Sequence, residues 1–435
     1  MFASEARNSI CSIPASLLAY ECLKKAYGLL GLDADNIYPF TTYDLLKAIK
    51  SDNGGIDESA AARVSDILKR AKKPCEISLD DVVEEGADKV DIEAVVGNPP
   101  YQINVTDDSG REQLFSVYNL FIDFARKTAT NSILITPGRF LFDIGRTPHA
   151  WNRAMLSDKH FSVVKYYPKS SDVFLSVDIK GGVAITEYDN SIEHEAIGMF
   201  VPFDELRRIM DKTLTHDAFI PISTIAYASE SYKFLEKMHS DYPQIAAMLS
   251  RGHRYDLKSN VLEKLDGIVF HEVKPDDGQD YLEIIGRISN KRASRYIKSD
   301  YIKQPDNCND YKVIIPSANG SGALGEVVST PLVGKPLVGH TQTFMSFGRF
   351  SDKNEAEACM KYLKSKFARA LLGTLKVTQT NPITVWRNVP LQDFSSSSDI
   401  DWSKSISDID SQLYSKYGLS DDEIAFIERN VQSMD

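Results

Sequence analysis

The chain has 435 residues, of which 43% are apolar and 26% are charged, and its net charge is −11. These values are typical of a folded globular protein with two or three domains, and the negative charge gives no overall support to nucleic-acid binding, which needs only a local basic face. No run of 18 apolar residues occurs, and the start lacks the basic-then-apolar order of a signal peptide, so a cytoplasmic protein without membrane contact is expected.

Helices and strands alternate in the first half of the chain. Hydrophobic periodicity predicts helices at 14–31, 58–73 and 112–129, strands at 90–96 and 131–137, and two later strands, FSVVKYYP and GGVAITEY. The stretch 90–96 is expected to be a buried strand. Strands separated by helices of this size predict a mainly parallel sheet with helices on both faces, which is an α/β fold.

The pattern changes near residue 200. Periodicity weakens there, glycine, proline, serine and basic residues become commoner, and regular helices return at 354–373 and at the end of the chain. The last helix is expected to begin with a capping box formed by Ser420 and Glu423. We therefore expect three parts, residues 1–200, 201–395 and 396–435.

The stretch VVGNPPYQ, residues 95–102, stands at the end of a predicted strand, where open α/β sheets bind ligands. Pro99 and Pro100 fix two φ angles and lack N–H groups, so their carbonyl oxygens are held as acceptors. Asn98 and Pro99 could accept both hydrogens of an exocyclic amine, while the ring of Tyr101 stacks on the group that carries it. A proline-rich turn capped by Asn is the alternative, but it does not explain Asn, both prolines and Tyr in this order.

Such hydrogen bonds would aim the nitrogen lone pair at an electrophile, so positioning and a methyl donor suffice without a strong base. GNPPYQ resembles motif IV of the amino-methyltransferases that act on adenine in DNA. ILITPGRFLFDIG, TPHAWNRAML and DVFLSVDIKGGVAITEYD resemble the methylase region of type IIG restriction–modification enzymes, and FMSFGRF and YLKSKFARALLGTLKVTQ resemble their distal part. The resemblance covers about residues 90–435. It implies an incomplete Rossmann-like methyltransferase sheet in 1–200, a mixed α+β target-recognition domain in 201–395, and a C-terminal helical segment.

The resemblance also implies roles for single residues. Asn98, Pro99, Pro100 and Tyr101 would form the catalytic corner, acting on an adenine flipped out of double-stranded DNA, with S-adenosylmethionine as the methyl donor. Asn98 would also lie against this cofactor. TTYDLLK resembles the acidic segment before the motif, in which Asp44 would contact the adenine ring of the cofactor; a helix N-cap is an equally good interpretation of Asp44.

The cofactor side of the family pattern is incomplete in this sequence. In that family a glycine-rich loop after the first strand cradles the methionine moiety, and an acidic residue after the second strand holds the ribose. No glycine-rich strand–loop–helix precedes residue 95, and Ser12 or Cys11 stands where the ribose acid is expected, with Glu5 as the nearby acid. We therefore expect a truncated or split methylase, with an unpaired apolar edge beside strand 90–96. A second chain would supply the missing part, or the chain would be inactive alone.

Residues 287–303 carry six Lys and Arg against one Asp, with tyrosines between them. This pattern is typical of a nucleic-acid surface and equally of a solvated face. Phosphate contacts are expected from Arg287, Lys291, Arg292 and Arg295. Lys376, Thr378 and Gln379 follow a helix and could reach base edges, although an ordinary helix-terminating turn explains them as well.

Other patterns in the sequence argue against further sites. GSGALG at 320–325 fits the glycine pattern of dinucleotide-binding loops, but EVVSTPLVGKP follows it in place of a helix, so a flexible turn is expected. The five cysteines are far apart, which is typical of small buried side chains in a reducing compartment, and the eight histidines form no close pair. No metal site is expected.

Three functions remain open at this point. The first is DNA adenine methylation. The second is the same motif acting on another amine, such as a protein glutamine or a guanine of ribosomal RNA. The third is a non-catalytic DNA-binding protein derived from a methylase, which the missing glycine loop supports. The large second half with its basic stretch favours DNA, because protein-directed enzymes need no such recognition domain.

Overall fold

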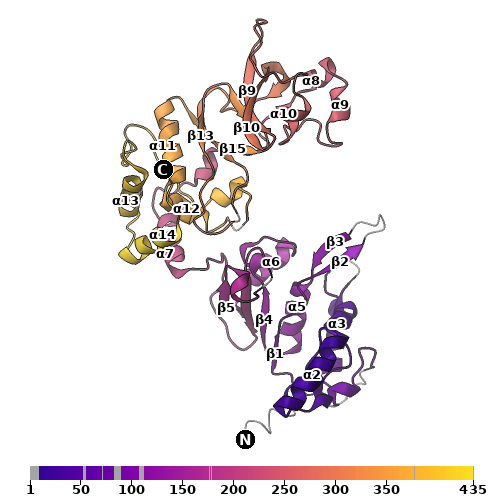
Figure 1. Ribbon diagram of the computed structural model, residues 1–435. Helices are drawn as coiled ribbons and strands as arrows, with labels where there is room; N and C mark the ends of the chain where they lie inside the picture. The colour runs from indigo at the N-terminus through magenta and orange to yellow at the C-terminus, as the bar shows by residue number, and fades with distance from the viewer. Residues whose placement is uncertain are drawn as a thin grey trace. The chain divides into compact units, whose positions relative to one another are not determined.

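The computed structural model describes residues 9–51, 55–70, 72–82, 90–106, 112–175, 177, 179–320, 322–376 and 378–434. Glu5, the expected alternative acid, lies outside these residues. The chain divides into two compact units, Met1–Phe200 and Val201–Asp435, and residues 396–435 are part of the second. Figure 1 draws the first unit from indigo to magenta and the second from magenta to yellow.

The helices of the first unit begin and end where the sequence supplies capping groups. Its α-helices are α2 (Leu17–Leu30), α3 (Thr42–Ile49), α4 (Glu58–Leu68), α5 (Tyr118–Thr128) and α6 (His149–Ser157). The Ser16 hydroxyl accepts a hydrogen bond from the amide of Ala19 at the start of α2, and Gly31 ends this helix with a φ of 70°. A left-handed residue after the last turn is the conformation that glycine adopts most readily, so the predicted end of this helix is confirmed.

The sheet of the first unit is mixed, which corrects the expectation of a mainly parallel sheet. Its strands are β1 (Ala94–Gly97), β4 (Asn131–Pro137), β5 (Phe161–Tyr167) and β6 (Val183–Asp189), in the order β1-β4-β6-β5. β1 and β4 are parallel, whereas β6 runs antiparallel to both β4 and β5. Helix α6 connects β4 to β5, but the described residues between β5 and β6 form no α-helix, and antiparallel neighbours need no crossover helix.

The strand before the NPPY motif is shorter and more exposed than expected. β1 begins at Ala94, and its residues alternate between exposed and half-buried. β1 pairs with β4 alone among the described strands, so its other edge is open. Val96 is 75% exposed. The prediction of a buried strand at 90–96 was therefore wrong, because an apolar strand is buried only when neighbours cover it.

Residues 112–116 also differ from the prediction, which extended a helix from 112 to 129. They form β3 (Glu112–Ser116), which pairs antiparallel with β2 (Gln102–Thr106) as a separate two-stranded hairpin. Helix α5 begins after it. One side of α5 packs with α3 and α4 through Leu120, Phe121 and Phe124, and the other packs against the sheet and α6 through Tyr118, Ile122 and Ala125.

The second unit contains three small sheets and eight α-helices among the residues that the structure describes. The four-stranded sheet has the order β13-β12-β15-β7, the three-stranded sheet β10-β9-β14 and the two-stranded sheet β11-β8. The strands are β7 (Ala226–Tyr227), β8 (Lys233–Phe234), β9 (Tyr281–Ile288), β10 (Lys291–Lys298), β11 (Ile302–Lys303), β12 (Tyr311–Pro316), β13 (Leu332–Gly334), β14 (Val338–His340) and β15 (Phe344–Phe350). The helices are α7 (Asp204–Leu214), α8 (Glu236–Asp241), α9 (Ile245–Met248), α10 (Val261–Lys264), α11 (Lys353–Lys364), α12 (Lys366–Leu372), α13 (Ile406–Lys416) and, last of all, α14 (Asp421–Asn430).

The last helix starts as the sequence predicts. The Ser420 amide donates to a carboxylate oxygen of Glu423 at 2.9 Å, which completes the capping box. The Glu423 side chain is buried and also forms an ion pair with Lys212 of α7 at 2.7 Å. The helix that ends the chain is thereby fixed to the helix that begins the second unit.

Candidate functional site

The NPPY motif lies at the carboxyl edge of the first unit's sheet. Gly97, the last residue of β1, is paired with Leu134 of β4, and because the two strands are parallel their carboxyl ends share this edge. Asn98 follows directly and is exposed, whereas Pro99 is buried. The prolines fix the backbone, so an exposed amide side chain is presented on a rigid turn.

Tyr101 closes the motif with a half-buried ring. Its carbonyl oxygen accepts a hydrogen bond from the amide of Val117 at 3.1 Å, which joins the turn to the start of α5. The ring packs beside the apolar cluster of α5, β4 and α6, and its buried hydroxyl has no hydrogen-bond partner among the described residues. Burial raises the pKa of Tyr101 to about 12, so the hydroxyl stays protonated at neutral pH.

Three loops meet at the same edge through close glycine contacts. The Gly138 amide, after β4, donates to the carbonyl of Gly182, before β6, at 3.0 Å. A Cβ atom at Gly182 would lie 2.3 Å from the Tyr167 carbonyl oxygen, and one at Gly181 would lie 2.6 Å from Cγ of Arg139. Neither position accepts a side chain, and both glycines have positive φ. The glycines of PGR and KGG are visible in the sequence. Their close contact could not be predicted from it, because the contact exists only when β6 runs antiparallel to β4.

A shallow hollow lies at the hairpin that follows the motif. It has a volume of about 350 Å³ and is lined by Asn104, Glu112, Gln113, Leu114 and Arg146. The Arg146 guanidinium donates to the carbonyl oxygen of Leu114 at 2.5 Å, which ties the hairpin to the loop after β4. The hollow was not predicted from the sequence, because residues 112–116 were expected to be part of a helix and not of a hairpin.

Asp44, the expected cofactor contact, is part of a helix capping box. Thr41 is the N-cap of α3, and one carboxylate oxygen of Asp44 accepts hydrogen bonds from the Thr41 amide at 2.9 Å and from its hydroxyl at 2.7 Å. These bonds lower the pKa of Asp44, the Thr41 hydroxyl contributing most. The carboxylate therefore stabilises the start of α3 from the third helical position, while Thr41 takes the N-cap position that was the alternative expectation for Asp44.

Ser12 stands in a short parallel bridge with Ile37. The Ser12 amide donates to the carbonyl of Asn36 at 3.0 Å, and the Tyr38 amide donates to the carbonyl of Ser12 at 2.9 Å. The Ser12 hydroxyl lies 2.6 Å from the hydroxyl of Tyr27 on α2. A neutral hydroxyl pair therefore occupies the place where the family resemblance implies a ribose-binding acid.

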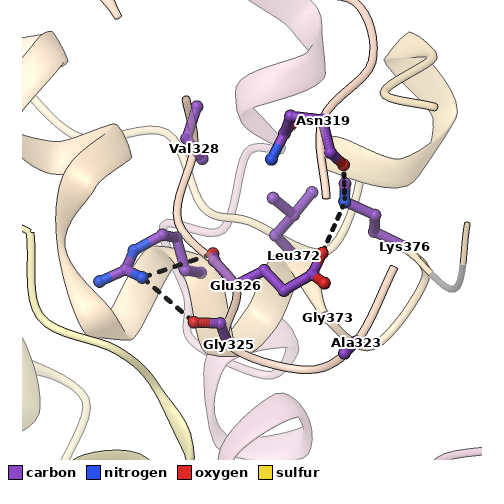
Figure 2. Close-up of a pocket in the computed structure, with 9 residues that line it drawn as sticks. Asn319, Ala323, Gly325, Glu326, Val328, Leu372, Gly373 and Lys376 are labelled. Carbon is purple, nitrogen blue, oxygen red and sulfur yellow. Dashed lines mark hydrogen bonds and ion pairs between the residues drawn. The ribbon is translucent and has the colours of Figure 1, made fainter. Parts of the chain in front are cut away.

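The GSGALG loop is packed against the body of the second unit. A Cβ atom at Gly325 would lie 2.2 Å from the carbonyl oxygen of Asn430, and the Arg369 guanidinium donates to the Gly325 carbonyl at 3.3 Å. Figure 2 shows the Glu326 carboxylate beside the Lys376 ammonium, which are 3.8 Å apart. The cavity there has a volume of about 10 Å³, which is about the minimum that one water molecule needs. No helix follows directly in the described residues, so the loop is not built like a dinucleotide-binding loop.

Of the three residues expected to reach base edges, one is exposed. Lys376 is 6% exposed, donates to the Asn319 carbonyl at 3.1 Å, and has a pKa lowered by burial. The Thr378 hydroxyl lies 3.0 Å from that of Thr380. Gln379 is exposed, and its carbonyl accepts from the Asn319 amide at 2.7 Å.

The four basic residues of the second unit's predicted nucleic-acid surface lie on the β9–β10 hairpin. Arg287 on β9 is paired with Arg292 on β10. Arg295 forms a bidentate ion pair with Asp266, with nitrogen–oxygen distances of 2.8 and 3.3 Å. Lys291 begins β10 and is exposed. In the part of the chain that the structure describes, no three His, Cys, Asp or Glu side chains gather as metal ligands do, and no helix is long and apolar enough to cross a bilayer.

Residues 36–174 match the family model of the Eco57I restriction-modification methylase. Among solved structures, the chain is similar to the type IIG restriction endonuclease BpuSI at 11% identity, covering 78% of this chain and 53% of that one with a TM-score of 0.33. It is similar to the type IIL restriction-modification enzyme MmeI in complex with DNA at 10% identity, covering 78% and 56% with a TM-score of 0.32.

A third solved structure is the ATP-dependent type ISP restriction-modification enzyme LlaBIII bound to DNA, at 12% identity, 88% and 33% coverage and a TM-score of 0.32. The chain thus spans 53% or 56% of the first two and 33% of the third. No protein of curated function matches the sequence. The turn 98–101 lies inside the segment that matches a restriction–modification methylase, and this match supports a methyltransferase.

Proposed function

We propose that this chain is an adenine-N6 DNA methyltransferase of a cytoplasmic restriction–modification system, acting on an adenine flipped out of double-stranded DNA. One observation carries the proposal. Asn98, Pro99, Pro100 and Tyr101 form a rigid turn at the carboxyl edge of the sheet, within the segment that matches a restriction–modification methylase. Ligands of open α/β sheets bind at this edge.

The chemistry of the turn suits an exocyclic amine. The exposed Asn98 amide oxygen and the Pro99 carbonyl would each accept one hydrogen of the adenine amino group, and the Tyr101 ring would stack on the base. These bonds localise the nitrogen lone pair and orient it. Tyr101 remains protonated because its pKa is raised to about 12, so it contributes a surface and not a base.

The methyl donor implied by this function is S-adenosylmethionine, and the described residues do not form a full cradle for it. Asp44 is bonded to the start of its own helix, and the hydroxyl of Ser12 is bonded to Tyr27 where a ribose-binding acid is expected. Asn98, the other residue expected against the cofactor, is exposed after β1. We derive no catalytic step through the cofactor for this reason.

A second candidate follows from the open edge of β1. An apolar strand with one neighbour is a pairing site, and Val96 on it is 75% exposed, as are Leu17 at 77% and Leu29 at 89% on α2 of the same unit. In this alternative the chain is a split or non-catalytic methylase-derived DNA-binding protein, and a second polypeptide supplies the strand beside β1 and the cofactor loop.

A methyl-transfer assay separates these functions. Full-length chain and labelled S-adenosylmethionine are incubated with duplex DNA, with ribosomal RNA and with a protein-substrate pool, each with and without candidate partner chains. Label in the adenine of DNA supports the proposal, and label in DNA only with a partner supports the split form. Label in RNA or protein, but not in DNA, refutes both.

The residue-level test is Asn98→Ala. This variant should lose methyl transfer by at least about a hundredfold while its affinity for duplex DNA is unchanged, because Asn98 positions the amine and makes no phosphate contact. Asn354→Ala, an exposed asparagine on α11, is the matched control and should keep full activity. Equal activity of Asn98→Ala and wild type would remove the NPPY turn from the mechanism.

A further inference from the structure

The outer part of the β9–β10 hairpin is a free two-stranded ribbon. β14 pairs with β9 only at Glu283, Ile284 and Ile285. Beyond this point β9 and β10 pair only with each other among the described strands, through the pairs formed at 286–288 and 291–293. Figure 1 draws β9 and β10 side by side, near α10.

The ribbon is held rigidly at its turn and at its base. Ser289 and Asn290 have φ angles of 51° and 62°, as in the tight two-residue turns that match the twist of a hairpin. The Ser289 amide donates to the carboxylate of Glu263 on α10. At the base, a Cβ atom on Gly286 would lie 2.6 Å from Cδ1 of Leu262, so the ribbon and α10 are in close contact. The exposed tip therefore has a defined direction.

The basic residues of the ribbon divide into anchors and free cations. Arg292 donates to the carbonyl and hydroxyl of Thr330 at 2.5 and 2.7 Å and lies 5.4 Å above the ring of Phe344. Arg295 is paired with Asp266. Arg287 and Lys291 are exposed and have no ion-pair partner among the described residues.

We propose that this tip enters the major groove of duplex DNA, with Arg287 and Lys291 on flanking phosphates and the Asn290 amide on a base edge. The proposal rests on the DNA partner of the proposed function. A two-stranded ribbon fits the major groove, and an asparagine side chain can both accept from and donate to an adenine edge. The Glu263 carboxylate accepts from the Ser289 amide and keeps its negative charge, but the positive charges of Arg287, Lys291 and Arg292 outnumber it on the ribbon.

The test uses the full-length chain with a pool of duplexes that share flanks and carry a randomised centre. Fluorescence anisotropy over a series of salt concentrations gives the affinity and its salt slope, and sequencing of the bound fraction gives the preferred centre. The variants are Arg287→Ala, Lys291→Ala and Asn290→Gly, since glycine keeps the positive φ that the turn requires. Lys404→Ala removes one exposed positive charge elsewhere in the second unit as the control.

Arg287→Ala and Lys291→Ala should each reduce the magnitude of the salt slope by about 0.9, since each phosphate contact contributes about that amount. Asn290→Gly should leave the slope unchanged and reduce the preference for the selected centre about tenfold. Lys404→Ala should match wild type. Variants that keep both the slope and the preference of wild type overturn this inference alone. A wild-type chain that binds no duplex overturns the DNA partner of the proposed function as well.

Discussion

His340 should make the second unit less stable in mild acid. It lies on β14, is fully buried, and its Nδ1 is 3.1 Å from the Thr341 carbonyl. A carbonyl only accepts, so Nδ1 carries the proton and Nε2 accepts from the Ser346 hydroxyl at 3.3 Å. Burial lowers the pKa of His340 to about 4, with the nearby Lys312 ammonium acting in the same direction.

The sign and size of the effect follow from proton linkage. An unfolded histidine has a pKa of about 6.5, so between about pH 6.5 and 4 the unfolded chain binds the proton that the folded chain does not. Stability is complete above this window and falls as pH falls through it. The shift of about 2.5 pKa units corresponds to about 3 kcal/mol, because one unit is about 1.4 kcal/mol.

Asp410 opposes this effect in the same unit. Its buried carboxylate accepts the amides of Lys366 and Phe367 at 3.0 and 2.9 Å at the start of α12, and burial raises its pKa to about 6. Here the folded chain binds the extra proton, so stability rises by about 3 kcal/mol as pH falls from about 6 to about 4. We expect the two contributions to cancel almost completely in wild type.

Urea unfolding of the second unit, followed by tryptophan fluorescence between about pH 7 and about pH 4, tests this balance. His340→Gln keeps an acceptor for Ser346 and removes the titration, so the variant should gain about 3 kcal/mol relative to wild type over this range. Asp410→Asn should show the opposite change. Only the pH dependence of each variant–wild type difference counts, since either substitution also alters packing. A difference that is constant with pH in both variants would refute the reasoning.

Three further predictions concern packing and charge. Gly325→Ala places a Cβ atom 2.2 Å from the Asn430 carbonyl and should lower the free energy of unfolding in urea by about 3 kcal/mol. Gly267→Ala, at a similar positive φ but with nothing near its Cβ, should lower it by about 1 kcal/mol, and equal losses would contradict the contact. Val96→Lys on the open edge of β1 should change the free energy of unfolding by no more than about 0.5 kcal/mol and should reduce self-association in light scattering. Unchanged association would show that the chain does not self-associate through this edge. Arg295→Ala should weaken DNA binding little and leave its salt slope unchanged, because its guanidinium is bonded to Asp266; a slope reduced by about one would place it on a phosphate.

The sequence predicted local features where neighbouring residues decide the structure. Ser16 and Gly31 bound α2, and Ser420 with Glu423 caps α14, because capping groups lie within one helical turn of the backbone atoms they satisfy. The strands β4, β5 and β6 were found for the same reason, since their apolar alternation and length are local. The sequence also predicted that GSGALG is not a dinucleotide-binding loop, because the residues described after it do not form a helix.

The predictions that failed depended on residues far away in the chain. The apolar spacing in 112–129 matched one face of a helix, yet 112–116 pair with 102–106, the strand that follows the motif turn. Strand direction in the sheet was also hidden, because the order β1-β4-β6-β5 places β6 between two earlier strands. Burial of β1 could not be read from its valines, since an apolar residue is buried only if another segment covers it.

For the candidate site, the sequence by itself determined which acceptors and which ring the turn offers, at Asn98, Pro99, Pro100 and Tyr101, because adjacent residues on a rigid turn need no distant partner to present them. Tertiary structure alone decided which basic residues are available. Arg292 and Arg295 are bound by Thr330 and Asp266, far away in the sequence, whereas Arg287 and Lys291 have no ion-pair partner in the part of the chain that the structure describes. The positions of charged residues can be read from the sequence. Whether a charged side chain is bound by another residue depends on contacts that exist only in the folded chain.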